Sequence, residues 1–344
     1  MRVMLLPGDG IGPEVLAASL PFLSWAAQKS QTPLDLDEGL IGGASIDASG
    51  VPLTAQTVVC CEAVDAVLLG AVGGPSWDAI EAGLRPERGL LALRKALGVY
   101  ANLRPVRVWP ELAAHSVLTP ERAVDTDLVI VRELTGGLYF GPRGRDHEKA
   151  WDTLVYSPAE VRRVARVALE LAQARRGRLT SVDKANVLAS SRLWREVVED
   201  EARAFDGVWL EHLYVDNAAM QLVADPCQFD VIVTGNLFGD ILSDLAAATT
   251  GSLGTLPSAS IGSGFALYEP VHGSAPDIAG TGAANPMGTI LSVAMCVEHS
   301  MGEPDLATEI REAVRRTVAR GDVPADLGGQ ASTTAFSASV MERL

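Results

Sequence analysis

Two aspartates at helical spacing are the first residues in this sequence whose type and position could do chemistry. Asp240 and Asp244 lie four residues apart in the segment 239–249, which we expect to be helical, so both carboxylates project from one face. A bound cation would offset their repulsion, and two carboxylates plus water suit Mg²⁺ or Mn²⁺. A solvated helix face is the alternative, although the segment is too apolar to be mostly exposed. Asp216 is a candidate third ligand, which spacing alone does not establish.

Three arginines are placed where they could bind a carboxylate substrate. Arg132 follows the apolar run 128–131, Arg104 lies in a segment kept extended by the proline after it, and Arg94 shares a helical face with Leu90. A guanidinium fork matches a carboxylate in two hydrogen bonds. Each arginine alone is more often a surface ion-pairing residue. Together in one pocket they would bind a dicarboxylate.

Lys184 and Tyr139 are candidates for proton transfer. Lys184 ends an extended run and could act as a general base if a nearby metal lowered its pKa. A structural lysine paired with Asp183 is the alternative. Tyr139 lies between glycines and has a phenol able to donate a proton, and an aromatic packing role is equally open.

A loop rich in glycine and proline near residues 269–280 carries His272 and Asp277. A carboxylate such as Asp277 can accept hydrogen bonds from a ribose diol and repels a 2′-phosphate. His272 is the one histidine in such a setting. The other four are interpreted as structural or surface residues: His115, His147, His212 and His299.

The opening segment resembles a dinucleotide loop but does not match the Rossmann fingerprint. Gly8, Gly10 and Gly12 alternate and Pro13 follows, whereas the fingerprint requires G-x-G-x-x-G. A structural strand-to-helix turn and a ligand loop are both open for this segment.

The elements that must position these residues are typical of an α/β fold. Buried strands are expected at 66–70, 128–132 and 231–234, and helices at 12–28, 158–176, 191–204 and 239–249. In sheets with parallel strands, ligands gather beyond the carboxyl ends of the strands. The sequence has no long linker and no internal repeat. If the protein has two lobes, their segments must therefore alternate along the chain.

Composition narrows the class of protein. The 344 residues include 28 Lys and Arg against 43 Asp and Glu, a net charge of −15 that repels nucleic acid and acidic membranes. Four cysteines do not form a disulfide framework and suit buried free thiols. The first apolar run breaks at Pro7, too early for a signal peptide, and no run is long enough to span a membrane. We therefore expect a cytoplasmic protein.

An ordered set of segments strongly resembles the β-decarboxylating dehydrogenases of the isocitrate/isopropylmalate family over nearly the whole chain. The segments are LLPGDGIGPEV (from Leu5), LLGAVGGP (from Leu68), RPERGLLALRK (from Arg85), ANLRPV (from Ala101), VRELTGGLYFG (from Val131), SVDKANVL (from Ser181), YVDNAAMQL (from Tyr214), GNLFGDILSDLA (from Gly235), GSLGTLPSAS (from Gly251) and EPVHGSAPDIAGTGAANP (from Glu269). One segment could be coincidence, but the ordered set is highly specific. The one departure from the family pattern is the segment 141–150, which is shorter than in many members of the family. The conformation of this segment, the arm expected at the dimer contact, is therefore left open.

The resemblance implies an α/β, isopropylmalate dehydrogenase-like two-lobe fold with a largely parallel central sheet that is not a Rossmann fold. It implies an NAD-binding lobe from residues 1–98 plus 252–344, and a second lobe, 99–251, that carries the contact of a homodimer. Lys184 and Asp216 would reach the site from the partner subunit. By the same resemblance, the substrate would be bound by Arg94, Arg104, Arg132, Asp216 and Leu90, and the metal ion by Asp216, Asp240 and Asp244. NAD would be bound by Gly74, Glu87, His272, Gly273, Asp277, Ile278 and Asn285.

The implied activity is NAD- and Mg²⁺- or Mn²⁺-dependent oxidative decarboxylation, with Lys184 as base and Tyr139 as proton donor. Leu90 and Leu91 favour an isopropyl group, so the expected substrate is 3-isopropylmalate, a leucine precursor. Isocitrate, homoisocitrate and tartrate dehydrogenases share the metal and arginine residues and remain alternatives. A non-catalytic regulatory paralogue is another, disfavoured by the intact candidate residues, and a phosphoryl-transfer enzyme is disfavoured by the missing P-loop.

Overall fold

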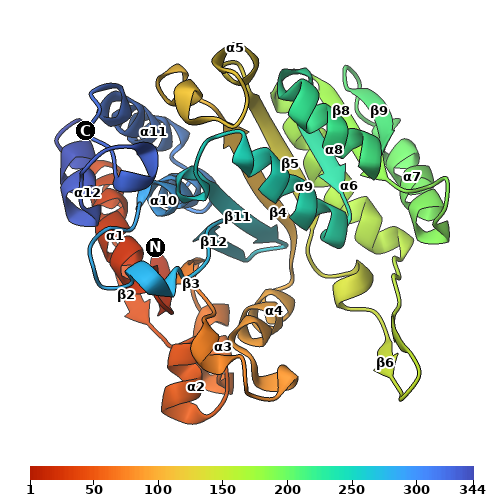
Figure 1. The fold of residues 1–344 in the computed structure, drawn as a ribbon, viewed down its shortest axis with the longest axis horizontal. Helices are drawn as coiled ribbons and strands as arrows, with labels where there is room; N and C mark the ends of the chain where they lie inside the picture. The colour runs from red at the N-terminus through yellow and green to blue at the C-terminus, as the bar shows by residue number, and fades with distance from the viewer. The chain divides into compact units, whose positions relative to one another are not determined.

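The computed structural model describes residues 1–344 and divides the chain into two compact units (Figure 1). Unit 1 consists of Met1–Gly98 and Ser252–Leu344, so both chain ends build it. Unit 2 is the continuous segment Val99–Gly251. Each unit has its own mostly parallel strands and covering helices, which confirms the predicted α/β class.

Unit 1 has five strands in the order β2-β1-β3-β12-β11. All neighbours are parallel except β11 and β12, which pair as an antiparallel hairpin. Helix α10 packs against α1, α11 and these two strands, and nearly all of it is buried. The elements are β1 (Arg2–Gly8), α1 (Gly12–Lys29), β2 (Asp35–Glu38), α2 (Gly43–Ser49), α3 (Ala55–Glu62), β3 (Ala66–Ala71), α4 (Pro86–Ala96), β11 (Pro257–Gly262), β12 (Ala266–Pro270), α10 (Met287–His299), α11 (Pro304–Ala319) and α12 (Thr333–Met341).

Unit 2 has five strands in the order β4-β5-β10-β8-β9, of which only β4 and β5 are antiparallel neighbours. Figure 1 shows α8 and α9 on one face of these strands and α6 on the other. The elements are β4 (Val99–Arg107), α5 (Pro120–Ala123), β5 (Asp127–Glu133), β6 (Arg143–Arg145), β7 (Ala150–Asp152), α6 (Pro158–Ala174), β8 (Arg178–Asp183), α7 (Ala189–Ala202), β9 (Trp209–Tyr214), α8 (Val215–Ala224), β10 (Val231–Thr234) and α9 (Asn236–Ala248).

Short 3₁₀ turns carry several of the candidate residues. Unit 1 contains η1 (Pro75–Trp77), η2 (Ala82–Leu84), η6 (Leu253–Thr255), η7 (Pro276–Ile278) and η8 (Ala325–Leu327), and unit 2 contains η3 (Pro110–His115), η4 (Gly137–Tyr139) and η5 (Pro226–Gln228).

The local sequence explains why these elements form. All six residues of β3 are buried, as expected of a continuous apolar run in a parallel sheet. Helix α6 begins at a capping box in which Ser157 and Glu160 satisfy each other's backbone N–H groups. In unit 2, alternate residues of β5, Leu128 and Ile130, face a core completed by Leu222 of α8 and other side chains of α8 and α9.

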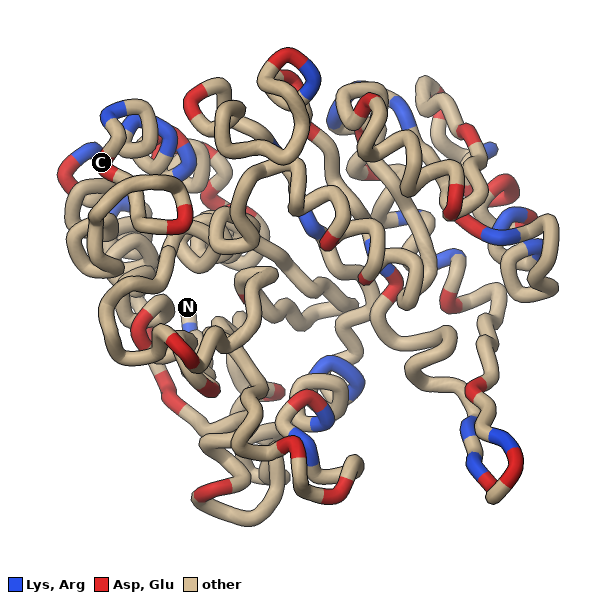
Figure 2. The backbone as a smooth tube through the Cα atoms, in the orientation of Figure 1, with Lys and Arg blue, Asp and Glu red and all other residues tan.

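Two features differ from expectation. Helix α9 begins at Asn236 rather than near residue 239, because β10 ends at Thr234 and Gly235 alone joins strand to helix. Cys60 and Cys227 are only partly buried, although all four cysteines are free thiols. The arm at 141–150, whose conformation the sequence left open, is an antiparallel hairpin of β6 and β7, and Figure 2 shows charges of both signs along it.

No helix in the structure combines the length and apolar character needed to cross a membrane.

Candidate active site

Arg104 and Arg132 converge on one carboxylate in unit 2. The two arginines lie on the paired strands β4 and β5. Nη1 of Arg132 donates a hydrogen bond to Oδ1 of Asp240, and Nη2 of Arg104 lies 3.7 Å from the same oxygen. Because the Arg132 side chain is only 4% exposed, its charge is poorly screened by water. Two of the three predicted arginines are therefore brought together with a predicted metal ligand.

Asp244 lies one turn further along α9 and shares Arg104 with Asp240. Nη1 of Arg104 donates to Oδ1 of Asp244 at 3.1 Å and to Oγ of Ser243 at 2.7 Å. Two guanidinium groups thus face two carboxylates, which offsets the repulsion expected from aspartates four residues apart. The side chain of Asp244 remains 61% exposed and accessible to a ligand.

Tyr139 joins this cluster from the turn η4. Its hydroxyl donates to Oδ2 of Asp240 at 2.9 Å, and the Arg132 guanidinium carbon lies 5.8 Å from its ring centroid. Burial raises the pKa of Tyr139, as does the negative charge of Asp240, while Arg132 and Arg104 act in the opposite direction. The phenol therefore keeps its proton near neutral pH and is able to donate it.

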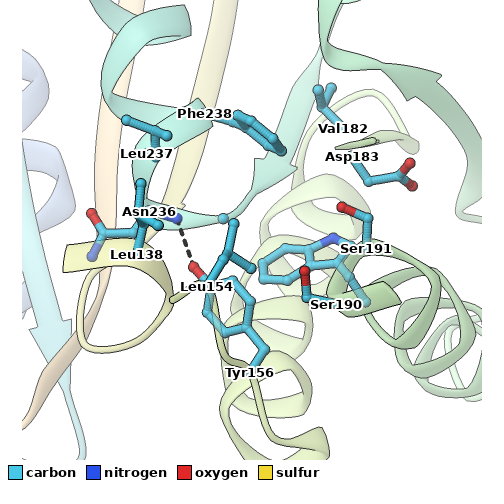
Figure 3. A pocket seen from close by; sticks show the side chains of 12 residues that line it. Leu138, Leu154, Tyr156, Val182, Asp183, Ser190, Ser191, Asn236, Leu237 and Phe238 are labelled. Atoms are coloured by element: carbon cyan, nitrogen blue, oxygen red, sulfur yellow. Dashed lines mark hydrogen bonds between the residues drawn. The ribbon is translucent and has the colours of Figure 1, made fainter. Parts of the chain in front are cut away.

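The first residue of α9, Asn236, is a member of the cluster that sequence reasoning missed. Its side-chain oxygen accepts from Nε and Nη2 of Arg132 at 3.1 and 2.8 Å, and its Nδ2 donates to the Gly136 carbonyl at 3.3 Å. Its backbone N–H donates to the hydroxyl of Tyr156 at 2.8 Å (Figure 3), which in turn donates to Glu133 at 3.2 Å. The sequence did carry a signal, an amide side chain two residues beyond the carboxyl end of the strand predicted at 231–234.

Lys184 and Asp216 form a separate pair within unit 2. Nζ of Lys184 lies 2.5 Å from Oδ1 of Asp216, and this hydrogen bond lowers the pKa of the Asp216 carboxyl. The alternative pairing of Lys184 with Asp183 is wrong, because Asp183 instead accepts two hydrogen bonds from Arg195, at 2.9 and 3.0 Å. Within one chain, no three His, Cys, Asp or Glu side chains are grouped so that they could hold a metal ion. Asp216 therefore does not join Asp240 and Asp244 in a three-ligand set within the chain.

Unit 1 holds the third arginine in a buried ion pair. Arg94, on α4, lies with its Nη2 2.5 Å from Oε1 of Glu269 on β12, and both side chains are less than a tenth exposed. Nε of Arg94 is buried without a hydrogen-bond partner. Leu90 is half-buried one turn earlier on the same helix. Sequence spacing could not identify Glu269 as the partner, because the pair is distant along the chain.

Most of the predicted nucleotide-binding residues of unit 1 are accessible. Glu87, Gly273, Asp277 and Ile278 are exposed, and Gly74 is half-buried. His272 is half-buried with its Nε2 covered, and Asn285 is buried. The Asn285 side chain accepts from the N–H of Met287, the first residue of α10, at 3.0 Å and donates to Asp326 at 3.0 Å. Its side chain is thus committed to shaping the loop that precedes α10.

An apolar pocket of unit 2 lies beside the arginine and aspartate cluster and shares Asn236 with it. Figure 3 shows it between Leu138, Leu154 and Phe238. Trp194 of α7 and other side chains from η4, α7 and α9 also line it. None of the predicted site residues lines this pocket, although it borders residues adjacent in sequence to Tyr139 and Lys184. The polar clusters are therefore better candidates for chemistry than the pocket.

Comparison with known proteins decides the family. A family model described as isocitrate/isopropylmalate dehydrogenase matches residues 2–342. The chain belongs to this family. A 3-isopropylmalate dehydrogenase of Anaeromyxobacter dehalogenans is 54% identical over 349 residues, spanning 100% of this chain and 99% of the relative. One of Nitratidesulfovibrio vulgaris is 58% identical over 328 residues, spanning 93% and 92%.

Solved structures agree with this family. The crystal structure of isocitrate dehydrogenase from Methylococcus capsulatus superposes with a TM-score of 0.88 at 35% identity, covering 99% of this chain and 98% of that one. A β-decarboxylating dehydrogenase from Thermococcus kodakarensis gives 0.83 at 37% identity, covering 99% and 95%. The predicted isocitrate/isopropylmalate dehydrogenase fold is therefore confirmed, as is the prediction of an oxidoreductase.

The donor atoms of this family member fit the groups that the family implies. Asp240 and Asp244 offer only carboxylate oxygens, the ligands that Mg²⁺ and Mn²⁺ prefer. In unit 1, Nε2 of His272 is buried without a hydrogen-bond partner, and burial lowers the pKa of this imidazole, so that it is neutral and can bind a neutral polar group. These atoms suit a hard cation and a nucleotide, respectively.

Proposed function

We propose that this protein is an NAD- and divalent-metal-dependent 3-isopropylmalate dehydrogenase of leucine biosynthesis. The cluster in which Arg104, Arg132 and Tyr139 meet Asp240 carries this proposal, because it combines carboxylate recognition, a proton donor and an oxygen ligand. The names of the relatives at 54–58% identity support the substrate. So does Leu90, an apolar side chain on the helix that carries Arg94.

The arginines bind the two carboxylates of the substrate in this proposal. Arg104 and Arg132 are held by β4 and β5 and already bind carboxylate oxygens. Arg94 has an unpartnered buried Nε that a substrate oxygen would satisfy. Leu90 contacts the isopropyl branch, where a carboxylate-bearing substituent would require a polar or cationic residue.

Asp240 and Asp244, together with Asp216 of the partner subunit, would hold the cation. When bound, the cation withdraws electron density from the 2-oxygen of the substrate, and NAD accepts the hydride from C2. The pairing of Lys184 with Asp216 supports the idea that these two residues act together. NAD is bound by Gly74, Glu87, His272, Gly273, Asp277, Ile278 and Asn285.

Two residues of the chain move the protons. Lys184 accepts the proton of the 2-hydroxyl group through water as the hydride leaves C2, giving a 2-keto acid. The carboxyl group on C3 then leaves as carbon dioxide, and its bonding electrons remain as an enolate. Tyr139 donates its proton to C3 and yields 4-methyl-2-oxopentanoate, a role that its protonated phenol allows.

A homodimer would complete each site, with Lys184 and Asp216 supplied by the partner. Exposed apolar side chains on the two adjacent helices α8 and α9 support a subunit contact: Met220 is 60% exposed, Val223 46% and Ile241 56%. We place the enzyme in the cytoplasm, in keeping with its four free cysteines.

The test is NADH formation from 3-isopropylmalate, isocitrate and tartrate, each with NAD and with NADP. We expect the highest kcat/KM for 3-isopropylmalate with NAD, since Asp277 would face a 2′-phosphate with like charge. A higher kcat/KM for isocitrate or tartrate would contradict the substrate, and equal values for NAD and NADP would contradict the role of Asp277. No turnover with any of the three would favour a non-catalytic paralogue.

A further inference from the structure

Two carboxylates in the opening glycine motif are not used by the proposed reaction. Asp9 lies in the turn between β1 and α1, and Glu14 lies in the first turn of α1. From their contacts we infer that Asp9 and Glu14 are positioning residues that fasten two separate segments, 74–87 and 273–285, which carry the residues assigned to NAD, onto the start of α1. The inference rests on the proposed binding of NAD to unit 1.

Asp9 fastens the first segment. Its side chain accepts three backbone hydrogen bonds: Oδ2 from Gly43 at 2.9 Å and from Gly73 at 2.8 Å, and Oδ1 from Ala44 at 2.8 Å. Asp9 is only 4% exposed, so these three backbone donors, rather than water, satisfy its carboxylate oxygens. Gly73 immediately precedes Gly74, which we assign to NAD binding.

Gly73 also brings this segment close to a second assigned residue. A Cβ added at Gly73 would lie 2.8 Å from Oε1 of Glu87, and the φ angle of Gly73 is +113°. Glycine adopts this conformation without strain, and its lack of a side chain leaves room for the Glu87 carboxylate. Holding the Gly73 N–H through Asp9 therefore sets the position of Gly73 beside the carboxylate of Glu87, and with it the position of the next residue, Gly74.

Glu14 fastens the second segment. Oε2 of Glu14 accepts from the Gly280 N–H at 3.1 Å, and Oε1 accepts from the Ala284 N–H and the Thr333 hydroxyl, each at 3.3 Å. Gly280 lies within the turn 279–282, and Ala284 lies just after it and directly before Asn285. One carboxylate thus holds both this turn and the residue that precedes Asn285.

The glycine motif itself is a packing surface rather than a phosphate cradle. The N–H of Asp9 donates to Ala71, that of Ile11 to Ser274 and that of Gly12 to Asp9, so these donors are already used. A Cβ at Gly10 would lie 2.0 Å from the Ser274 carbonyl oxygen. The open choice between a ligand loop and a structural turn is therefore decided in favour of a turn that supports ligand loops.

The test measures NADH binding to the full-length protein by fluorescence titration, without turnover. Glu14→Gln replaces one of the two accepting oxygens with a donor, and Asp9→Asn does the same for the other segment. Asp305→Asn is the matched control, since Asp305 is an exposed acid in the first turn of α11, away from both segments. We expect the Kd for NADH to rise about fivefold or more in Glu14→Gln and in Asp9→Asn, with the control unchanged.

Amide hydrogen exchange separates positioning from general stability. In the wild-type protein without NADH, the amides of Gly73, Gly280 and Ala284 are expected to be protected, and Glu14→Gln should speed exchange at Gly280 and Ala284 but not at Gly73. The KM for 3-isopropylmalate should change little in either variant, because Asp9 and Glu14 form no hydrogen bond with Arg94, Arg104 or Arg132, which we assign to substrate binding.

Each outcome bears on the inference. Unchanged NADH affinity in both folded variants would overturn it while leaving the proposed function intact. Failure of the wild-type protein to bind NADH would overturn both. If neither variant folds, amide hydrogen exchange in the wild-type protein tests the inference on its own. Amides of Gly73 and Gly280 that exchange as fast as those of a free peptide would overturn it.

Discussion

The side-chain oxygen of Asn236 accepts two hydrogen bonds from the guanidinium of Arg132, which leaves Nη1 of Arg132 directed at Asp240. The amide of Asn236, at the start of α9, thus sets the orientation of the Arg132 guanidinium group, which we assign to substrate binding. The pairing is buried, with Asn236 1% exposed and Arg132 3% exposed.

Asn236→Ala should therefore impair the use of 3-isopropylmalate without affecting NAD. We expect kcat/KM for the hydroxy acid to fall roughly 10- to 100-fold, because the freed guanidinium loses its fixed orientation. Steady-state kinetics with each substrate varied in turn measures this. Gln173→Ala, at an exposed amide on α6, is the control. Equal losses for the hydroxy acid and for NAD would show that Asn236 acts only on stability.

Removing an anionic ligand should raise the metal requirement. In Asp244→Asn we expect the Mg²⁺ concentration for half-maximal activity to rise roughly tenfold or more, since affinity for a hard cation follows the charge of its ligands. Asp200→Asn removes a comparable charge from an exposed ion pair with Arg203 and should have no effect. Activity that persists unchanged in excess EDTA would rule out the metal site.

Substitution of Leu90 tests the apolar branch pocket. Leu90→Ser should weaken the transition-state stabilisation of 3-isopropylmalate by roughly 1–3 kcal/mol, the usual range for a few apolar contacts. Malate, which has no isopropyl group, serves as the internal control and should lose much less. If kcat/KM falls equally for both substrates, Leu90 is a packing residue of α4.

Mixed dimers test the shared site. Co-expression of an inactive Lys184→Met chain with an inactive Asp240→Asn chain should restore about a quarter of wild-type activity, because random pairing makes half the dimers mixed and each has one intact site. Asp240→Asn paired with Asp244→Asn is the control, since each of its sites keeps a lesion. No gain over the separate mutants, with mixed dimers demonstrated, would place Lys184 and Asp240 of one chain in the same site.

Acid should destabilise the protein through His212 of β9. Burial lowers the pKa of His212, and the nearby Arg195 adds to this effect, against the opposing influence of Glu199 and Asp183. The unfolded chain takes up a proton near pH 6.5 but the folded protein does so only at lower pH, so stability present above 6.5 is lost as the pH falls.

His212→Gln should reduce the fall in unfolding free energy between neutral and mildly acidic pH, as measured by urea denaturation. His147→Gln, on the exposed hairpin, is the control. An unchanged pH profile in His212→Gln would show that other groups cause the acid sensitivity.

Local patterns predicted much of this molecule, and long-range contacts account for what was missed. Apolar runs located β3, β5 and β10, because a buried strand needs continuous apolar residues. The partners of the candidate residues were not predictable in the same way. Glu269 pairs with Arg94 and Asn236 with Arg132 through the meeting of distant strands and helices, which no spacing rule encodes. Asp9 and Glu14 were likewise visible only as part of a glycine-rich turn.

The order of the chain also shapes how the protein is made. Unit 2 is continuous, so it can fold on the ribosome while the C-terminal part of unit 1 is still being synthesised. Strand β3 must wait for β12, since Leu68 pairs with Tyr268. Until then an all-apolar strand keeps one backbone edge unpaired, and such an edge recruits other chains. A nascent chain that stops before Tyr268 would therefore have a folded unit 2 and an N-terminal segment whose strand β3 lacks one partner strand. We expect such a chain to aggregate through the unpaired edge of β3.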